Sequence, residues 1–188
     1  MIDNSKYTSN VSYFFVEILS ICFFVIFFLS GCAKWQGAIG IDANFSVEMD
    51  KAVSMLLMRT KDPLDKNLPV LVATVVNIDS LEESSTFGRT LSQFIASALV
   101  RRGFPVKEVR VRKSLFVKER KGEFILSRDI RDLSLHHNAQ AIIIGTYSQG
   151  RYAVQVNLRI VDSITNTIIS SYDVVLPLGS ETKVLISK

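Results

Sequence analysis

Residues 70–76 read VLVATVV, an unbroken run of small and apolar side chains that is rich in β-branched valine. A run of this kind is typical of a strand that is buried on both faces of a sheet. A second run, AIIIGTY at 141–147, has the same character. The two runs predict two inner strands, and the segments between and after them are interpreted from there.

The segment after the first run has the pattern of an amphipathic helix. Ser84 or Ser85 can cap its start, and it ends at two arginines followed by Gly103, which suits a left-handed cap. The apolar residues that share one face of this helix are Phe87, Leu91, Phe94, Ile95, Ala98 and Leu99. A short strand at 106–111 follows, and a strand, a helix and a strand in this order predict a right-handed crossover.

The second half of the chain predicts a hairpin, a helix and a meander. Segments 115–118 and 123–126 flank a polar, glycine-bearing turn, and Ser127 can cap a helix at 128–137. Segments 151–162 and 167–176 alternate apolar and polar side chains, which is typical of antiparallel strands with one exposed face. The residues expected to share one face of the last strand are Ile168, Tyr172, Val174 and Leu176.

These elements predict an α/β fold of the α+β type, with a mixed five-stranded sheet in the order β-α-β-(hairpin)-α-β-β-β and helices mainly on one face. A helix from Ser46, the expected N-cap, to residue 59 precedes it. With 48% hydrophobic and 21% charged residues, the chain is too apolar to be disordered. The predicted divisions are 1–31 as a signal peptide, 32–45 as a tether, 46–69 as the helix and its connector, 70–178 as the domain and 179–188 as a tail.

The front of the chain carries an export signal. Residues 18–29 hold twelve residues without a charge, which fits the apolar core of a signal peptide better than a membrane span of about 20 residues. The next residues complete LSGC at 29–32, which resembles the processing box of bacterial lipoproteins. Cleavage between Gly31 and Cys32 would leave Cys32 as the lipid-bearing N-terminus. The alternative is an uncleaved anchor with Cys32 as an ordinary thiol.

The lipoprotein interpretation predicts the compartment. Cys32 would carry a diacylglycerol and an N-acyl chain, a permanent anchor, and we expect no other cofactor. Residue 33 is alanine and not the aspartate that usually retains such lipoproteins in the inner membrane. We therefore expect a protein anchored in the outer membrane with its domain facing the periplasm. Cys22 would leave with the signal, so no disulfide is expected.

Motifs of catalysis are missing from the sequence. It has no G-x-x-x-x-G-K-[ST], G-x-G-x-x-G or G-x-S-x-G pattern. His136 and His137 are the only histidines, and adjacent helical positions diverge too far to chelate one metal ion. We expect no enzyme, no catalytic or metal-binding residue and no small-molecule substrate.

A basic segment is the strongest charge asymmetry. Residues 101–131 hold eleven lysines and arginines against four acidic residues. An exported chain meets anionic lipid, cell-wall polymers or acidic partners, so we expect no nucleic acid to bind. The alternative is a solvated edge whose charges discourage aggregation. The candidate patch is Arg110, Arg112, Lys118, Arg120 and Lys121.

Several stretches together resemble the FlgO family of lipoproteins associated with the flagellar outer-membrane region. The stretches are VLVATVVNIDSL from residue 70, S-x-F-G-R-x-L at 85–91, RRGFPV at 101–106, EVR at 108–110, GEFILSRD at 122–129, AIIIGTY at 141–147 and VNLRIVD at 156–162. The resemblance implies a non-enzymatic accessory of the flagellar basal body. Its partners would be the outer membrane, envelope or flagellar proteins and other copies of itself.

The resemblance also marks candidate interface residues, namely Arg89, Arg128, Asp129, Gly145, Thr146 and Tyr147. Each of them also has a structural explanation. The arginines and Asp129 can lock a helix to the hairpin, Gly145 can allow close packing, and Tyr147 can lie at the rim of the core. The alternative function is a periplasmic lipoprotein module for secretion, assembly or the binding of anionic envelope polymers, unrelated to flagella.

Overall fold

The computed structural model describes residues 42–81, 84–109, 116–118, 124–126 and 128–188. The side chains of residues 116–118, 124–126 and 128–131 also lie outside the description. The predicted signal peptide, the cleavage site at Gly31 and Cys32, and most of the tether are outside it as well. Within the described residues, no helix is both long and apolar enough to cross a bilayer.

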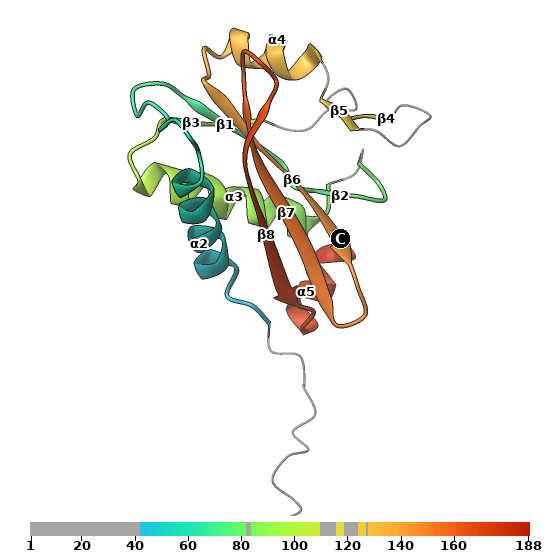
Figure 1. Ribbon diagram of the computed structural model, residues 1–188. Coiled ribbons are helices and arrows are strands. Elements are labelled where there is room, and N and C mark those ends of the chain that lie inside the picture. The colour runs from blue at the N-terminus through green and yellow to red at the C-terminus, as the bar shows by residue number, and fades with distance from the viewer. Residues whose placement is uncertain (1–41, 82–83, 110–115, 119–123, 127) are drawn as a thin grey trace, which may run out of the picture. The chain divides into compact units, whose positions relative to one another are not determined.

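A mixed sheet is the centre of the domain, as predicted (Figure 1). Its strands lie in the order β3-β1-β6-β7-β8, and a short β2 also pairs with β6. β3, β1 and β6 are parallel, whereas β6, β7 and β8 form the predicted antiparallel meander. The strands are β1 Val70–Ala73, β2 Val76–Asn77, β3 Val106–Val109, β6 Ala141–Gln149, β7 Ala153–Asp162 and β8 Ile168–Pro177.

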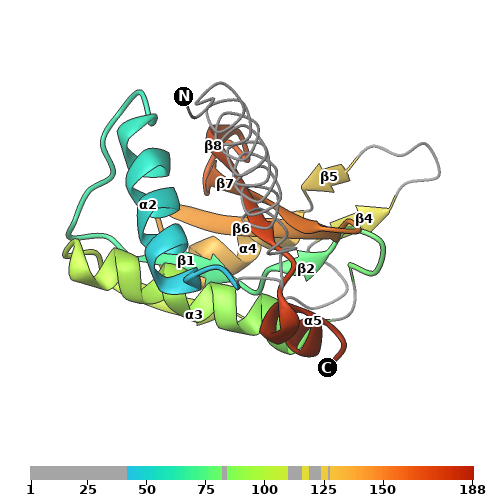
Figure 2. The same ribbon diagram turned by 90° about the horizontal axis from the view of Figure 1, so that it is seen from below.

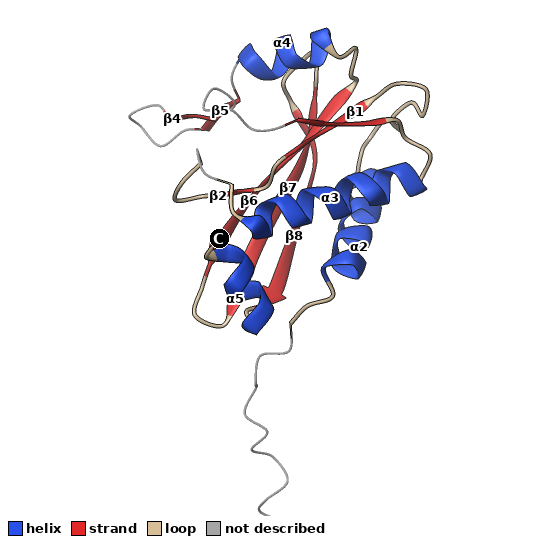
Figure 3. Ribbon diagram, turned by 180° about the vertical axis from the view of Figure 1, so that it is seen from behind, coloured by secondary structure: helices blue, strands red, loops and turns tan. Residues whose placement is uncertain are grey.

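Helices cover the two faces unequally, and three of them share one side (Figures 2 and 3). The helices are α2 Phe45–Met58, α3 Thr86–Arg101, α4 Arg128–His136 and α5 Ser180–Ile186. α2, α3 and α5 pack over the main core, whereas α4 adds Leu133 to a smaller cluster on the opposite face. The predicted hairpin forms as β4 Phe116–Lys118 and β5 Phe124–Leu126, a two-stranded sheet of its own.

The run at 70–76 is not one strand, which corrects the prediction. Thr74 and Val75 leave the ladder, so that β1 ends at Ala73 and β2 begins at Val76. The Val75 amide donates instead to the Ser92 hydroxyl of α3 at 2.9 Å. The first turn of α3 lies so close to this break that the Cβ of an alanine at Gly88 would be 1.9 Å from the Val75 carbonyl oxygen, so position 88 requires glycine.

α3 confirms the predicted cap, and α2 corrects one. The Ser85 hydroxyl accepts from the Gly88 amide at 3.1 Å. α2 is capped by Asn44 and not by Ser46, because the Asn44 side-chain oxygen accepts from the Val47 amide. The earlier start includes Phe45 in the helix, and its ring meets the Phe87 ring edge to face at 5.6 Å between centroids.

Asp50 joins the two long helices. Its carboxylate accepts from Arg102 at 2.9 Å and from Arg101 at 2.6 Å. The hydrogen bonds from these guanidinium groups hold the pKa of the Asp50 carboxyl well below its usual range. The arginine pair expected only to end α3 therefore also ties α3 to α2.

Ile168 does not share the buried face of β8, which corrects another prediction. The pairing of β7 with β8 shifts between Ile160 and Val161, so Ile160 lies opposite Ser170 and Val161 lies opposite Ile168. The extra residue in β8 reverses the alternation at that point. Ile168 is therefore exposed, whereas Val174 and Leu176 are buried.

The expected tail contains a helix, α5, and its first turn is capped by Asp42, the first residue that the structure describes. The Asp42 carboxylate accepts from the Glu181 amide at 2.9 Å and from the Thr182 amide and hydroxyl at 2.8 and 2.7 Å. Gly179 leaves room for it, because a Cβ there would lie 2.4 Å from the carboxylate. Local sequence patterns cannot reveal a cap supplied from 140 residues away.

Replacing Gly88 with alanine should destabilise the domain, although alanine favours an isolated helix by about 1 kcal/mol. The added methyl group would collide with backbone, which cannot move without shifting β1 and β2. We expect a loss of about 3 kcal/mol or more in the free energy of unfolding, measured by urea denaturation. The exposed Gln93→Ala on the same helix is the control and should stay within about 0.5 kcal/mol. An unchanged Gly88→Ala midpoint would contradict the close approach.

The Asp42 cap predicts a pH dependence of stability. Burial raises the pKa of the Asp42 carboxyl, but hydrogen bonds from Thr182, Glu181 and Ser180 outweigh it, so the pKa is lowered. The cap therefore stabilises the fold above the unfolded pKa of about 4 and is lost as the pH falls through the folded value. The stability advantage of the wild type over Asp42→Asn should shrink between about pH 5 and pH 2 in urea titrations. Asp62→Asn corrects for the loss of one exposed carboxylate.

Candidate functional site

Four residues from the stretches that resemble the FlgO family meet where α3 begins. Ser85, Phe87 and Gly88 of α3 and its cap lie against Tyr147 of β6, and we call these four residues the motif cluster. The Tyr147 hydroxyl donates to the Ser85 hydroxyl at 2.7 Å, and the rings of Phe87 and Tyr147 meet edge to face at 5.1 Å. The cluster holds the helix on the sheet.

Gly145 and Thr146 extend this contact along β6. The Cβ of an alanine at Gly145 would lie 2.7 Å from Leu158 and 3.0 Å from Val75, so the position takes no side chain without movement. Thr146 is half-buried and lies opposite Val76 in β2 and Asn157 in β7. Tyr147 is only 2% exposed. The structure places these residues within the packing of the domain.

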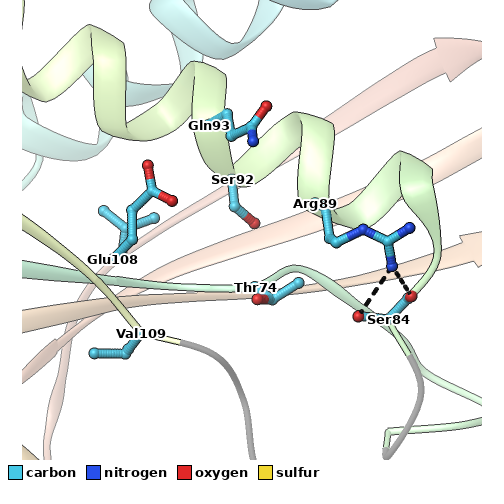
Figure 4. Close-up of a pocket in the computed structure, with 8 residues that line it drawn as sticks. Thr74, Ser84, Arg89, Ser92, Gln93, Glu108 and Val109 are labelled. Carbon is cyan, nitrogen blue, oxygen red and sulfur yellow. Dashed lines mark hydrogen bonds between the residues drawn. The ribbon is translucent and has the colours of Figure 1, made fainter.

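Arg89 faces a different environment, a pocket of about 590 Å³ beside α3 (Figure 4). The pocket lies at the carboxyl ends of the parallel strands β1 and β3, where ligands often bind in open α/β sheets. Its lining residues are Val72, Thr74, Ser84, Arg89, Ser92, Gln93, Glu108 and Val109. Thr74, Gln93 and Glu108 are not among the site residues predicted from the sequence, although their positions after β1, on α3 and in β3 could have suggested them.

Some polar groups of this pocket are already engaged in hydrogen bonds within the domain. The Arg89 guanidinium is committed in part, since it donates to the Ser84 carbonyl and to the Thr86 hydroxyl at 2.8 Å. The Ser92 hydroxyl donates to the Gly88 carbonyl and accepts from the Val75 amide. The expected contact of Arg89 with the hairpin is not among the contacts of the described residues.

The rings of His136 and His137 lie next to each other. Their rings meet edge to face at 5.1 Å at the end of α4. Within the described part of the chain, no three His, Cys, Asp or Glu side chains are grouped closely enough to hold a metal ion. Lys107 donates to the His137 carbonyl at 3.2 Å, which links α4 to β3.

Four exposed apolar side chains lie at the end of the sheet that bears α4. This α4-end patch consists of Leu68 before β1, Leu135 on α4, Ile164 in the β7–β8 turn and Ile168 at the start of β8. Gln140 connects these segments: its side chain donates to the Leu68 carbonyl at 2.8 Å, and its own carbonyl accepts from Ser163 at 2.8 Å. Leu135 is 65% exposed and Ile164 is 69% exposed.

The predicted basic patch largely escapes the description. Arg110, Arg112, Arg120 and Lys121 lie outside the described residues. Lys118 belongs to β4, and Arg128 and Asp129 form the start of α4, but their side chains are not described. Their roles remain predictions from the sequence.

Removing the bridge between Ser85 and Tyr147 should weaken the docking of α3. Ser85→Ala removes the helix cap and should cost about 1–2 kcal/mol in unfolding free energy, and Tyr147→Phe should cost about 1 kcal/mol. The double variant should lose less than the sum, because both substitutions remove one shared bond. Urea denaturation measures all three, and Tyr152→Phe, at an exposed ring, is the control. Strict additivity would show that the bridge contributes nothing.

Comparison with known proteins identifies the domain. The family model described as "FlgO protein" matches residues 50–181. A comparison with curated proteins finds no match. Among solved structures, the LpoB C-terminal domain from Salmonella enterica superposes with a TM-score of 0.51 at 16% identity, covering 71% of this chain and 98% of that one.

Two further structures are less similar. The PelC dodecamer from Paraburkholderia phytofirmans has a TM-score of 0.44 at 15% identity, covering 66% of this chain and 83% of its own. A lipoprotein from Neisseria meningitidis has a TM-score of 0.40 at 17% identity, covering 61% and 83%. At such identities the LpoB likeness shows a common fold and no more. The family match spans most of the chain, and the protein belongs to the FlgO family.

Proposed function

We propose that this protein is a non-enzymatic accessory of the bacterial envelope and is held in the outer membrane by lipid on Cys32. From the periplasmic side, the protein binds other proteins of the flagellar basal body. The observation that carries the binding role is the α4-end patch, where four large apolar side chains are exposed at one end of a small domain. Clustered exposed apolar side chains mark protein contact sites.

The use of the residues from the stretches that resemble the FlgO family supports a binding role over a catalytic one. Ser85, Gly88 and Tyr147 are engaged in holding α3 on the sheet, and none of them is available to a substrate. Arg89, one of the candidate interface residues, lines the pocket beside α3. In the proposal, this pocket receives a polar group of the partner, with Glu108 and Gln93 as further contacts.

The flagellar form of the proposal rests on membership of the FlgO family. The anchor rests on LSGC at 29–32 and on the apolar segment before it. The alternative, a lipoprotein module for secretion or for holding anionic polymers, depends on the basic residues between 110 and 121. The experiment therefore has to test the anchor, the α4-end patch and motility in variants of one parent strain.

The test replaces the chromosomal gene of the native organism with three variants: Cys32→Ser, Leu135→Lys with Ile164→Lys, and the control Val175→Lys. The mass of the envelope-extracted wild type should correspond to a chain starting at residue 32 with acyl chains, and Cys32→Ser should lose them. Swimming in soft agar should drop at least several-fold for Cys32→Ser and for the double variant. Val175 is 67% exposed on β8, so Val175→Lys matches the patch substitutions and should swim normally.

The outcomes separate the parts of the proposal. An unprocessed chain in the wild type would overturn the lipid anchor. A strain from which the gene is deleted is made alongside the three variants. If it swims normally, the flagellar role is overturned and the envelope-module alternative is favoured. Normal swimming of the double variant, at wild-type protein level, would overturn the role of the α4-end patch alone.

A further inference from the structure

The chain enters the described domain at a fixed place. Asp42 is bonded to the first turn of α5, and two residues later Asn44 caps α2. The start of α2 and the whole of α5 therefore lie at one end of the domain. Figure 1 shows this end opposite the one that bears α4. Any anchor on Cys32 would hold the domain through this end.

The tip of the β6–β7 hairpin lies at the same end. The Tyr152 carbonyl accepts from the Leu178 amide at 2.9 Å, and Leu178 adjoins Gly179, which packs against Asp42. Tyr152 is 80% exposed, and Arg151 beside it is exposed as well. On α5, Lys183 and Val184 are also exposed. We call Arg151, Tyr152, Lys183 and Val184 the α5-end surface.

The chemistry of the α5-end surface suits the boundary between lipid and water. Tyrosine is enriched at membrane interfaces, since its ring is apolar and its hydroxyl stays hydrated. Arginine and lysine lay their apolar stems along a surface and direct their charge to the headgroups. Each such cation is attracted to the negative surface potential of an anionic leaflet. Glu181 is the exposed acid beside them on α5, whereas the Asp42 carboxylate is occupied by amide and hydroxyl donors.

The tether makes even a weak surface contact effective. Nine residues, 33–41, separate Cys32 from Asp42 and span about 35 Å at full extension. A domain held so close to the bilayer meets it at an effective concentration of about millimolar. The anchor thus lets a surface contact contribute to docking even where it would be too weak to bind vesicles by itself.

We propose that the α5-end surface rests on the anionic bilayer that holds the anchor, so that the α4-end patch points away from the membrane. This inference rests on the proposed function, because it needs the lipid on Cys32. It gives the anchored domain one orientation: β7, ten residues long, would stand with its Tyr152 end at the membrane and its Ile164 end about 34 Å away.

The experiment places one tryptophan at either end of β7. The lipidated full-length protein, carrying Trp35→Phe, is reconstituted in phosphatidylethanolamine–phosphatidylglycerol vesicles that contain a headgroup-nitroxide lipid. Tyr152→Trp should be quenched at least twofold more than Ile164→Trp, a matched control because both positions are exposed. Arg151→Glu with Lys183→Glu should abolish the difference, and so should vesicles of phosphatidylcholine.

Each outcome decides the inference. Equal quenching of the two tryptophans in vesicle-bound protein would overturn the orientation while leaving the anchor intact. A difference that persists in phosphatidylcholine would overturn the recognition of anionic lipid. Protein that fails to float with the vesicles would lack the anchor, and this would overturn the proposed function together with the inference.

Discussion

The contact of α3 with the break between β1 and β2 is the constraint on which the rest of the domain depends. Gly88 lets the helix backbone approach the Val75 carbonyl, and Ser92 supplies the hydrogen bond that Val75 loses by leaving the ladder. A buried amide without such a partner would be costly. Because the break is satisfied in this way, β1 can pair with β3 and β6 while β2 continues beside β6. The pocket beside Arg89 opens at this junction.

The two ends of the sheet have different characters. At one end, Asp42 joins the entering chain to α5, and polar and aromatic side chains are exposed around it. At the other end, Gln140 ties three loops together and leaves Leu135 and Ile164 exposed. This difference between the two ends would suit the tethered adaptor that we propose, since one end would face its support and the other would remain free for a partner. The proposed roles of the two ends follow from this asymmetry.

Much of the fold could be predicted because its signals are local. The buried run at 141–147, the apolar face of α3 and the alternation in β7 are short-range patterns, and they appear as strands or a helix at the expected places, whereas the run at 70–76 divides into β1 and β2. The errors arose where a distant residue intervened. The side chain of Asp42 caps α5, a helix within the expected tail, and the bulge opposite Val161 leaves Ile168 exposed. The patches at the ends of the sheet were missed for the same reason, since their members are far apart along the chain.

The sequence by itself indicated the mixed sheet, most of its strands and helices, an α3 cap at Ser84 or Ser85 and the left-handed Gly103, because periodicity, capping and glycine positions act over a few residues. Its motif stretches indicated the family, which the family model shows. Only the tertiary structure decided that Ser85 also anchors Tyr147, that Arg89 faces a pocket and that Asp42 caps α5. Each of these depends on which segments the sheet brings together, and strand order is a property of the whole chain that no local pattern contains.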